Sequence, residues 1–184
     1  MEQELSIATV LRSGNVAKPI NVKFVGKKNV GVRSLSSSIQ STIKSLLSFA
    51  ESKDLDLNKL IKYSTGDIAN SDANGNCLVF CVYDICQTDS FTYAVSKLKK
   101  PSLKEKYVLV GNKCDLEYWR RVSLGEGVAA SQPTGTSFME VSTHTGLHID
   151  FLIDHILESV FGGRLTMLSK RIETNEKTRS SRIG

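Results

Sequence analysis

The sequence predicts an α/β fold with one mostly parallel sheet covered by helices on both faces. Two features of the chain predict it. Short apolar segments alternate with segments whose apolar residues recur at helical spacing. The short segments are continuously apolar, which is typical of strands buried on both faces of a parallel sheet. With 184 residues, the chain is long enough for one domain with a substantial core.

Five strands are expected from the short apolar segments. The strongest candidate, CLVFCVYD, is rich in β-branched and aromatic residues and follows the turn signal Asn74-Gly75. The segment IKYS and the residues just before it form the weakest candidate. The expected strands cover residues 20–25, 58–64, 77–84, 107–110 and 138–141.

Helices are expected between these strands and after the last one. Ser123 and Glu126 have the spacing of a capping box, which begins a short helix. The last helix has one apolar face and is expected to end at Gly162-Gly163. The other helices are predicted by apolar residues at helical spacing over 35–47 and 90–98, and the last one covers 149–160.

The composition is that of an ordinary globular protein, with 40% hydrophobic and 23% charged residues. No secretory signal is expected, and no apolar run approaches the roughly 20 residues of a membrane span. Four cysteines without a CxxC pair suit a reduced, cytoplasmic chain, and Cys77 and Cys81 are expected to be buried. The three histidines lie late in the sequence, and no metal site is predicted.

The sharpest signal is the string VLVGNKCDL. A buried strand is expected to end at Gly111 and to bring Asn112, Lys113 and Asp115 to the edge of the sheet where ligands bind in parallel α/β folds. N-K-x-D is the motif of guanine-nucleotide-binding proteins, and the whole string resembles the Ras-like small GTPases. The resemblance implies that GTP or GDP is bound at the C-terminal ends of the strands.

The chemistry of these three side chains fits such a ligand. A carboxylate at Asp115 can accept hydrogen bonds from the ring N–H and the exocyclic amino group of guanine, a pair of donors that adenine lacks. The Asn112 amide can meet the base edge and tie neighbouring loops together. The stem of Lys113 can lie along the base plane, with its ammonium near the ring.

A second segment, EVSTHTG, resembles the loop of the same family that ends in Ser-Ala-Lys. The backbone N–H groups of that loop contact the guanine carbonyl oxygen. Ser142, Thr143 and His144 occupy its positions here. Thr143 can still offer a backbone donor, whereas His144 replaces the usual lysine. These residues complete the predicted guanine-binding set.

A third segment, VGKKNVGVRSL, lies where a phosphate-binding loop is expected, between the first strand and the first helix. A P-loop reads GxxxxGK[ST], and Gly26 and Gly31 have its spacing. Val32 occupies the lysine position and Arg33 the Ser/Thr position, so a phosphate contact and a Mg²⁺ ligand are missing. The candidate phosphate-binding residues are Gly26, Lys27, Lys28, Asn29, Val30, Gly31, Val32 and Arg33.

The switch segments of the family are not matched. Its DxxG motif follows the third strand, where KYSTGDIAN places Ser64 at the Asp position. D-A-N-G over 72–75 fits the bare pattern but lies directly before a strand, and we interpret it as a turn. No catalytic residue is assigned, and Mg²⁺ is a candidate cofactor whose usual protein ligands are missing. The stretch from Gly26 to Asn112 is short for the family by about one strand of five to six residues and a switch loop.

Two functions fit this pattern. The intact N-K-C-D favours a guanine-nucleotide-binding signalling protein with weak or lost GTP hydrolysis. Val32, Arg33 and the missing DxxG favour a pseudo-GTPase that acts as a protein-interaction module without nucleotide cycling. A truncated or alternatively spliced product of an active family member would give the same picture. The C-terminal TRSSRIG has no prenylation cysteine, which fits the estrogen-regulated growth-inhibitor-like branch.

The chain is expected to have three parts: an extension over 1–18, a Ras-like domain over 19–163 that is short in the switch region, and a basic tail over 164–184. The tail carries six Lys/Arg against two acids, which accounts for most of the net charge of +5. It suits at most a weak attraction to anionic membranes, and no nucleic-acid partner is expected. No motif identifies an effector or regulator, and a cytoplasmic monomer is expected.

Overall fold

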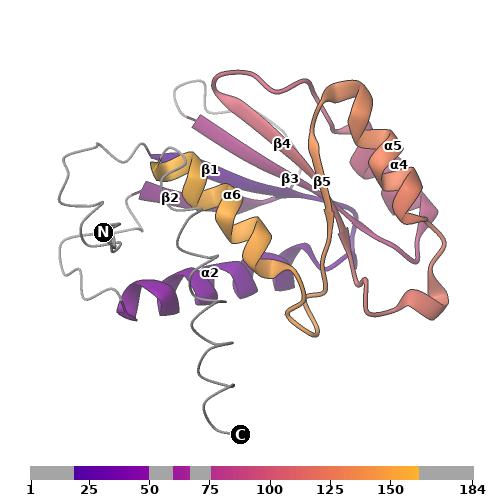
Figure 1. Cartoon of the computed structure of the whole chain (residues 1–184), viewed down its shortest axis with the longest axis horizontal. Helices are drawn as coiled ribbons and strands as arrows, with labels where there is room; N and C mark the ends of the chain where they lie inside the picture. The colour runs from indigo at the N-terminus through magenta and orange to yellow at the C-terminus, as the bar shows by residue number, and fades with distance from the viewer. Residues whose placement is uncertain (1–18, 50–59, 67–75, 162–184) are drawn as a thin grey trace, which may run out of the picture.

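The computed structural model of the chain describes residues 19–49, 60–66 and 76–161. Within these residues, five strands form one sheet in the order β2-β1-β3-β4-β5, and every neighbouring pair is parallel (Figure 1). The predicted α/β class with a mostly parallel sheet is therefore confirmed. The strands are β1 (Ile20–Val25), β2 (Ile61–Thr65), β3 (Asn76–Asp84), β4 (Glu105–Asn112) and β5 (Ser137–Glu140).

Helices cover both faces of the sheet, as predicted (Figure 1). On one face, α2 and α6 pack against each other and against β1. On the other face, α4 packs on β3, and α5 packs on β4 and β5. The helices are α2 (Val32–Phe49), α4 (Thr88–Ser96), α5 (Leu124–Ser131) and α6 (Ile149–Phe161), with short 3₁₀ turns η1 (Glu117–Trp119) and η2 (Gln132–Thr134).

Two apolar clusters, one on each face, bury both sides of the central strands. On the α2/α6 face, the rings of Phe24 and Phe80 stack with centroids 5.2 Å apart. On the α4/α5 face, Tyr83 meets Phe91 edge to face at 5.0 Å, and the predicted buried thiol of Cys81 is fully covered. Residues buried from both sides explain why the strand segments are continuously apolar in sequence.

The boundaries differ from the sequence predictions where polar residues extend an element. β4 continues two residues beyond the predicted 107–110, to Asn112, because its pairing with β3 runs on to Asp84. α2 begins at Val32, three residues before the predicted start at Leu35, and its first turn includes the exposed polar residues Arg33 and Ser34. The weak strand predicted over 58–64 is β2, which begins at Ile61 and ends one residue later than expected.

The predicted capping box is confirmed. The Ser123 side chain accepts a hydrogen bond from the Glu126 backbone, and the Glu126 carboxylate accepts from the Ser123 N–H. The predicted extension over 1–18, the D-A-N-G turn, Gly162-Gly163 and the tail over 164–184 lie outside the described residues. No helix in the described part of the chain is long and apolar enough to cross a bilayer.

Candidate functional site

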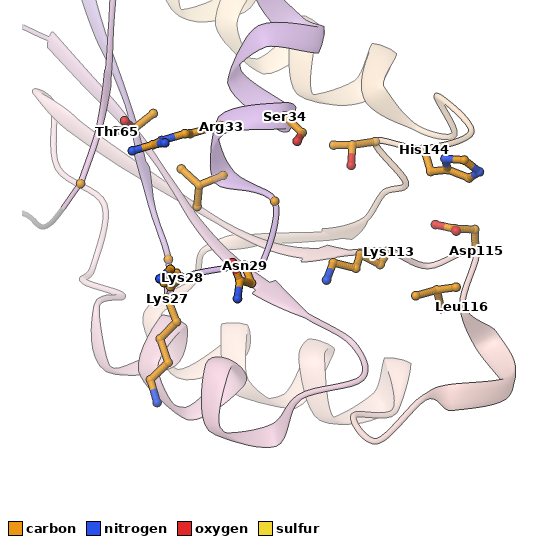
Figure 2. Close-up of a pocket in the computed structure, with 15 residues that line it drawn as sticks. Lys27, Lys28, Asn29, Arg33, Ser34, Thr65, Lys113, Asp115, Leu116 and His144 are labelled. Carbon is orange, nitrogen blue, oxygen red and sulfur yellow. The ribbon is translucent and has the colours of Figure 1, made fainter.

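A pocket of about 910 Å³ opens at the carboxyl edge of the sheet (Figure 2). This volume lies within the range of about 300–1,000 Å³ that is usual for small-molecule sites. Figure 2 shows Lys113, Asp115, Leu116 and His144 at one end, which we call the base end. The other end, which we call the phosphate end, is formed by residues 26–29 and 31–34, which precede and begin α2, and by Thr65-Gly66 at the end of β2.

Asn112, the last residue of β4, joins the two ends. Its Nδ2 donates to the Val30 carbonyl oxygen at 2.8 Å, and its Oδ1 accepts from the Thr143 N–H at 3.3 Å. The residue has no exposed surface. Asn112 was expected to tie neighbouring loops together and to meet the base edge. The structure shows the first role, and the side chain has no exposed surface for the second. The Thr143 N–H, expected to be a free donor, is used in this contact.

The base end is ordered by Ser142. Its hydroxyl donates to Asp115 Oδ1 at 2.5 Å, which leaves Oδ2 of the carboxylate at the pocket. The same Ser142 oxygen accepts from the backbone N–H groups of His144 and Thr145 at 3.2 and 3.1 Å. Ser142 itself is fully buried. The two predicted guanine-binding loops are therefore hydrogen-bonded to each other through the side chains of Asp115 and Ser142.

Asp84 is a site residue that the sequence analysis missed. Its Oδ2 lies 2.6 Å from the Lys113 ammonium, and its Oδ1 accepts from the Cys86 N–H at 2.9 Å. Asp84 is 2% exposed, so the ion pair is shielded on the acid's side. The signal was present in the sequence: Asp84 is the polar last residue of an apolar strand, and parallel pairing places it opposite Asn112.

A second ion pair, between Arg120 and Glu140, stabilises the base end. Arg120 contacts both carboxylate oxygens of Glu140, at 2.6 and 2.7 Å, and also Glu117. The hydrogen bonds to Glu140 and then those to Glu117 raise the pKa of Arg120. Fork-shaped contacts of this kind fix geometry as well as adding energy. They join the end of β5 to η1, the turn that follows Asp115 in the chain.

Two glycines allow the phosphate end its close packing. A Cβ on Gly26 would lie 2.6 Å from the Val82 carbonyl oxygen and 2.9 Å from Cγ2 of Val32. Gly31 has φ +92°, and a Cβ there would collide with Nδ2 of Asn112. The loop therefore keeps the backbone approach that glycine permits, although its lysine and hydroxyl are replaced.

The cations of the phosphate end differ in their partners. The Lys27 ammonium is 2.8 Å from Asp89 of α4, a contact that lowers the pKa of Asp89. In Figure 2 its side chain extends away from the other labelled residues. Lys28 and Arg33 are exposed and line the pocket. Val32 is half-buried and packs against the apolar cluster of the α2/α6 face.

The pocket thus brings the three predicted segments together. Every predicted site residue lines it except Val30, Asn112 and Ser142, which are buried behind its wall. The sequence analysis missed four lining residues, which flank the predicted segments or lie at the end of β2. They are Ser34, Thr65, Gly66 and Leu116.

A family model, the Ras family, matches residues 64–161 of the chain, which is more than half of it. The chain belongs to the Ras family. The match begins after the phosphate loop and includes both loops of the base end. Within the Ras family, no finding distinguishes the growth-inhibitor-like branch.

Individual Ras-family relatives agree with this assignment. Ras-related protein Rab-2B of Dictyostelium discoideum is 33% identical over 105 residues, which cover 55% of this chain and 48% of that protein. Ras-related protein O-RAL of Diplobatis ommata is 32% identical over 106 residues, 54% of this chain and 50% of that protein. GTP-binding protein ypt2 of Schizosaccharomyces pombe is 32% identical over 76 residues, which cover 39% of this chain and 38% of that protein. The chain therefore spans half or less of these relatives.

Proposed function

We propose that this protein binds a guanine nucleotide in the 910 Å³ pocket and acts as a Ras-like signalling protein with weak or lost GTP hydrolysis. The observation that carries the proposal is the Asp115 carboxylate. It lines the base end and is oriented by the buried Ser142 hydroxyl at 2.5 Å. The printed name of one relative, GTP-binding protein ypt2, supports the same ligand class.

Recognition of guanine follows from the different hydrogen bonding of the two carboxylate oxygens of Asp115. Oδ1 of Asp115 is occupied by Ser142, and the remaining acceptor capacity faces the pocket. Guanine presents two adjacent donors to such an acceptor, whereas adenine would leave the carboxylate unpaired. The Lys113 stem and Leu116 supply apolar surface beside the base. Lys113 is held by Asp84, so this wall is in place before a ligand arrives.

Weak hydrolysis follows from the residues of the phosphate end. Phosphoryl transfer depends on a lysine at the β- and γ-phosphates and on charge neutralisation around the transferred group. Val32 occupies the lysine position and packs into the core instead. We therefore expect turnover below that of relatives with a complete P-loop.

A pseudo-GTPase is the second candidate, and the packing of Val32 favours it. An apolar side chain at this position contributes to the fold and not to a phosphate contact. In this case the fold would serve as a protein-interaction module, and nucleotide would not be cycled. The two candidates differ in one measurable property, because only the first requires saturable and base-selective nucleotide binding.

The proposal includes a cytoplasmic monomer with a three-part chain. The reduced state of the cysteines supports the cytoplasm, since the described structure leaves Cys77, Cys81, Cys86 and Cys114 free. The positive charge of residues 164–184 supports at most a weak contact with anionic membranes. Analytical ultracentrifugation and vesicle sedimentation test these two points.

The decisive test is calorimetric titration of the nucleotide-stripped full chain with GDP and with ADP. We expect saturable binding of GDP and none of ADP at the same concentrations. Asp115→Ala should weaken GDP binding at least about 100-fold, since two hydrogen bonds to a charged acceptor are lost. Asp150→Ala is the matched control, because Asp150 is an exposed acid of α6 outside this pocket. Equal weak binding of GDP and ADP would reject guanine recognition.

A further inference from the structure

Two cations at the phosphate end have no ion-pair partner among the described residues. Lys28 and Arg33 are exposed and line the pocket, and neither takes part in a salt bridge. The other two basic chains that line it are neutralised, Lys27 by Asp89 and Lys113 by Asp84. Among the described residues, the pocket therefore presents two uncompensated positive charges at the end opposite the base-recognising carboxylate.

The start of α2 adds to this positive end. Leu35 N–H donates to the Gly31 carbonyl oxygen at 2.9 Å, and the N–H groups before it precede the first such bond of the helix. The first turn of α2 contains no acidic residue that would neutralise them. Arg33 is the second residue of the helix, so its guanidinium and the helix N-terminus favour the same anionic group.

Mg²⁺, which the Ras family implies, does not fit the residues described at this end. The ion requires oxygen ligands in a nearly octahedral arrangement, and proteins usually bind it through one or two carboxylates together with the phosphates of a substrate. Arg33 occupies the hydroxyl position of the loop, and its guanidinium has a permanent positive charge and no acceptor. Among the described lining residues, the carboxylate belongs to Asp115 at the base end, where Ser142 occupies one oxygen. Ser34 and Thr65 offer only neutral hydroxyls.

Resting on the guanine-nucleotide binding proposed above, we propose that the phosphate end takes a nucleoside diphosphate through Lys28 and Arg33 and without Mg²⁺. The positive charge of two side chains and one helix N-terminus balances the negative charge of a diphosphate more closely than that of a triphosphate. The lysine that would bridge the last two phosphates of a triphosphate is replaced by the packed Val32. Affinity for GDP then depends on salt and on these two side chains, and not on magnesium.

The test is calorimetric titration of the full chain with GDP in excess EDTA and again in excess MgCl₂. We expect the two dissociation constants to agree within about twofold. Lys28→Gln and Arg33→Gln should each weaken GDP binding about tenfold in EDTA, since each removes a charge-assisted contact. Lys104→Gln is the matched control, because Lys104 is exposed just before β4, at the edge of the sheet opposite the pocket. The substitutions are on exposed side chains, and circular dichroism verifies the fold of each variant.

The outcomes separate this inference from the proposed function. GDP binding that tightens tenfold or more with Mg²⁺, or that is unchanged in both variants, would overturn the metal-free diphosphate site and leave guanine binding standing. GTP binding tighter than GDP in EDTA would likewise overturn it. If GDP binds in neither buffer, the proposed function itself fails.

Discussion

The base end and the phosphate end of the pocket are built in opposite ways. At the base end, two buried side chains hold the residues that line the pocket: Ser142 bonds to Asp115, and Asp84 bonds to Lys113. At the phosphate end, Lys28 and Arg33 have no ion pair among the described residues, and Val32 belongs to the core. The Ras-family match covers residues 64–161, which contain the first set and not the second. Under the proposed function, the base end keeps the arrangement that recognises guanine while the residues of the phosphate end have changed.

Asn112 is the residue on which both ends depend, so its loss should have the largest effect. Asn112→Ala leaves the buried Val30 carbonyl and the partly buried Thr143 N–H without their partner. We expect the free energy of unfolding to fall by about 2–4 kcal/mol, since each orphaned group costs about 1–3 kcal/mol. GDP binding should be lost with it. Urea denaturation and calorimetry measure the two effects.

A control for this prediction is Asn76→Ala. Asn76 begins β3 at the opposite edge of the sheet and is partly exposed, so little change is expected. If Asn112→Ala unfolds at the same urea concentration as the unmodified chain, the two ends are not joined through this side chain.

Substitution of Asp84 should have a smaller effect than loss of Asn112, and this effect should be confined to the base end. Asp84→Asn keeps an acceptor for the Cys86 N–H but removes the charge that holds Lys113. We expect GDP binding to weaken about fivefold to tenfold, equivalent to about 1 kcal/mol, because the Lys113 stem loses its fixed position. The Lys113 side chain is 30% exposed, so the loss in folding stability should stay near that of a partly screened pair, about 1–2 kcal/mol.

A double-mutant cycle isolates this contact. Lys113→Met and the combined variant should show a coupling energy of about 1 kcal/mol or more with Asp84→Asn. Strictly additive effects would mean that Asp84 acts on the fold and not through Lys113.

His155 gives the smallest effect and lies outside both ends. Burial, together with the positive charge of Lys106, lowers the pKa of His155 below 6.5, against the opposing effect of Glu158 and Asp154. The unfolded chain therefore binds the proton more readily than the folded chain. The contribution of neutral His155 to stability is present above about pH 6.5 and is lost as the pH falls below it.

We expect the urea midpoint to drop between about pH 7 and about pH 5.5, and to drop less in His155→Leu. GDP affinity at neutral pH should be the same in both proteins, because α6 contributes no residue to the pocket. An equal drop in the variant would assign the pH dependence to other groups.

The sequence predicted the base end more fully than the phosphate end. N-K-C-D and S-T-H are short strings whose residues act near their own position in the chain, and the structure brings them together around Asn112. The pairing of Asp84 with Lys113 could not be predicted from either string alone, since it depends on the register of β3 against β4. Continuous apolar segments predicted the sheet well, but they could not show that polar Asn112 still belongs to a strand.

The phosphate end was harder because the effect of a replaced residue depends on packing. The sequence shows Val32 at the lysine position, but only the structure shows its side chain packed against Gly26 and the core. In the same way, Lys27 and Lys28 are alike in sequence, and contact with Asp89 of α4 distinguishes them. The partner of Lys27 lies 62 residues away in the chain, so the local sequence could not identify it.

The central claim is that base recognition and phosphate binding are separable in this pocket. Its most direct test is a comparison of guanosine, adenosine and GDP by calorimetry in EDTA. The account predicts weak but selective binding of guanosine, no binding of adenosine, and GDP binding about 100-fold tighter than guanosine through two charge-assisted contacts. Equal binding of guanosine and adenosine, or GDP no tighter than guanosine, would contradict it.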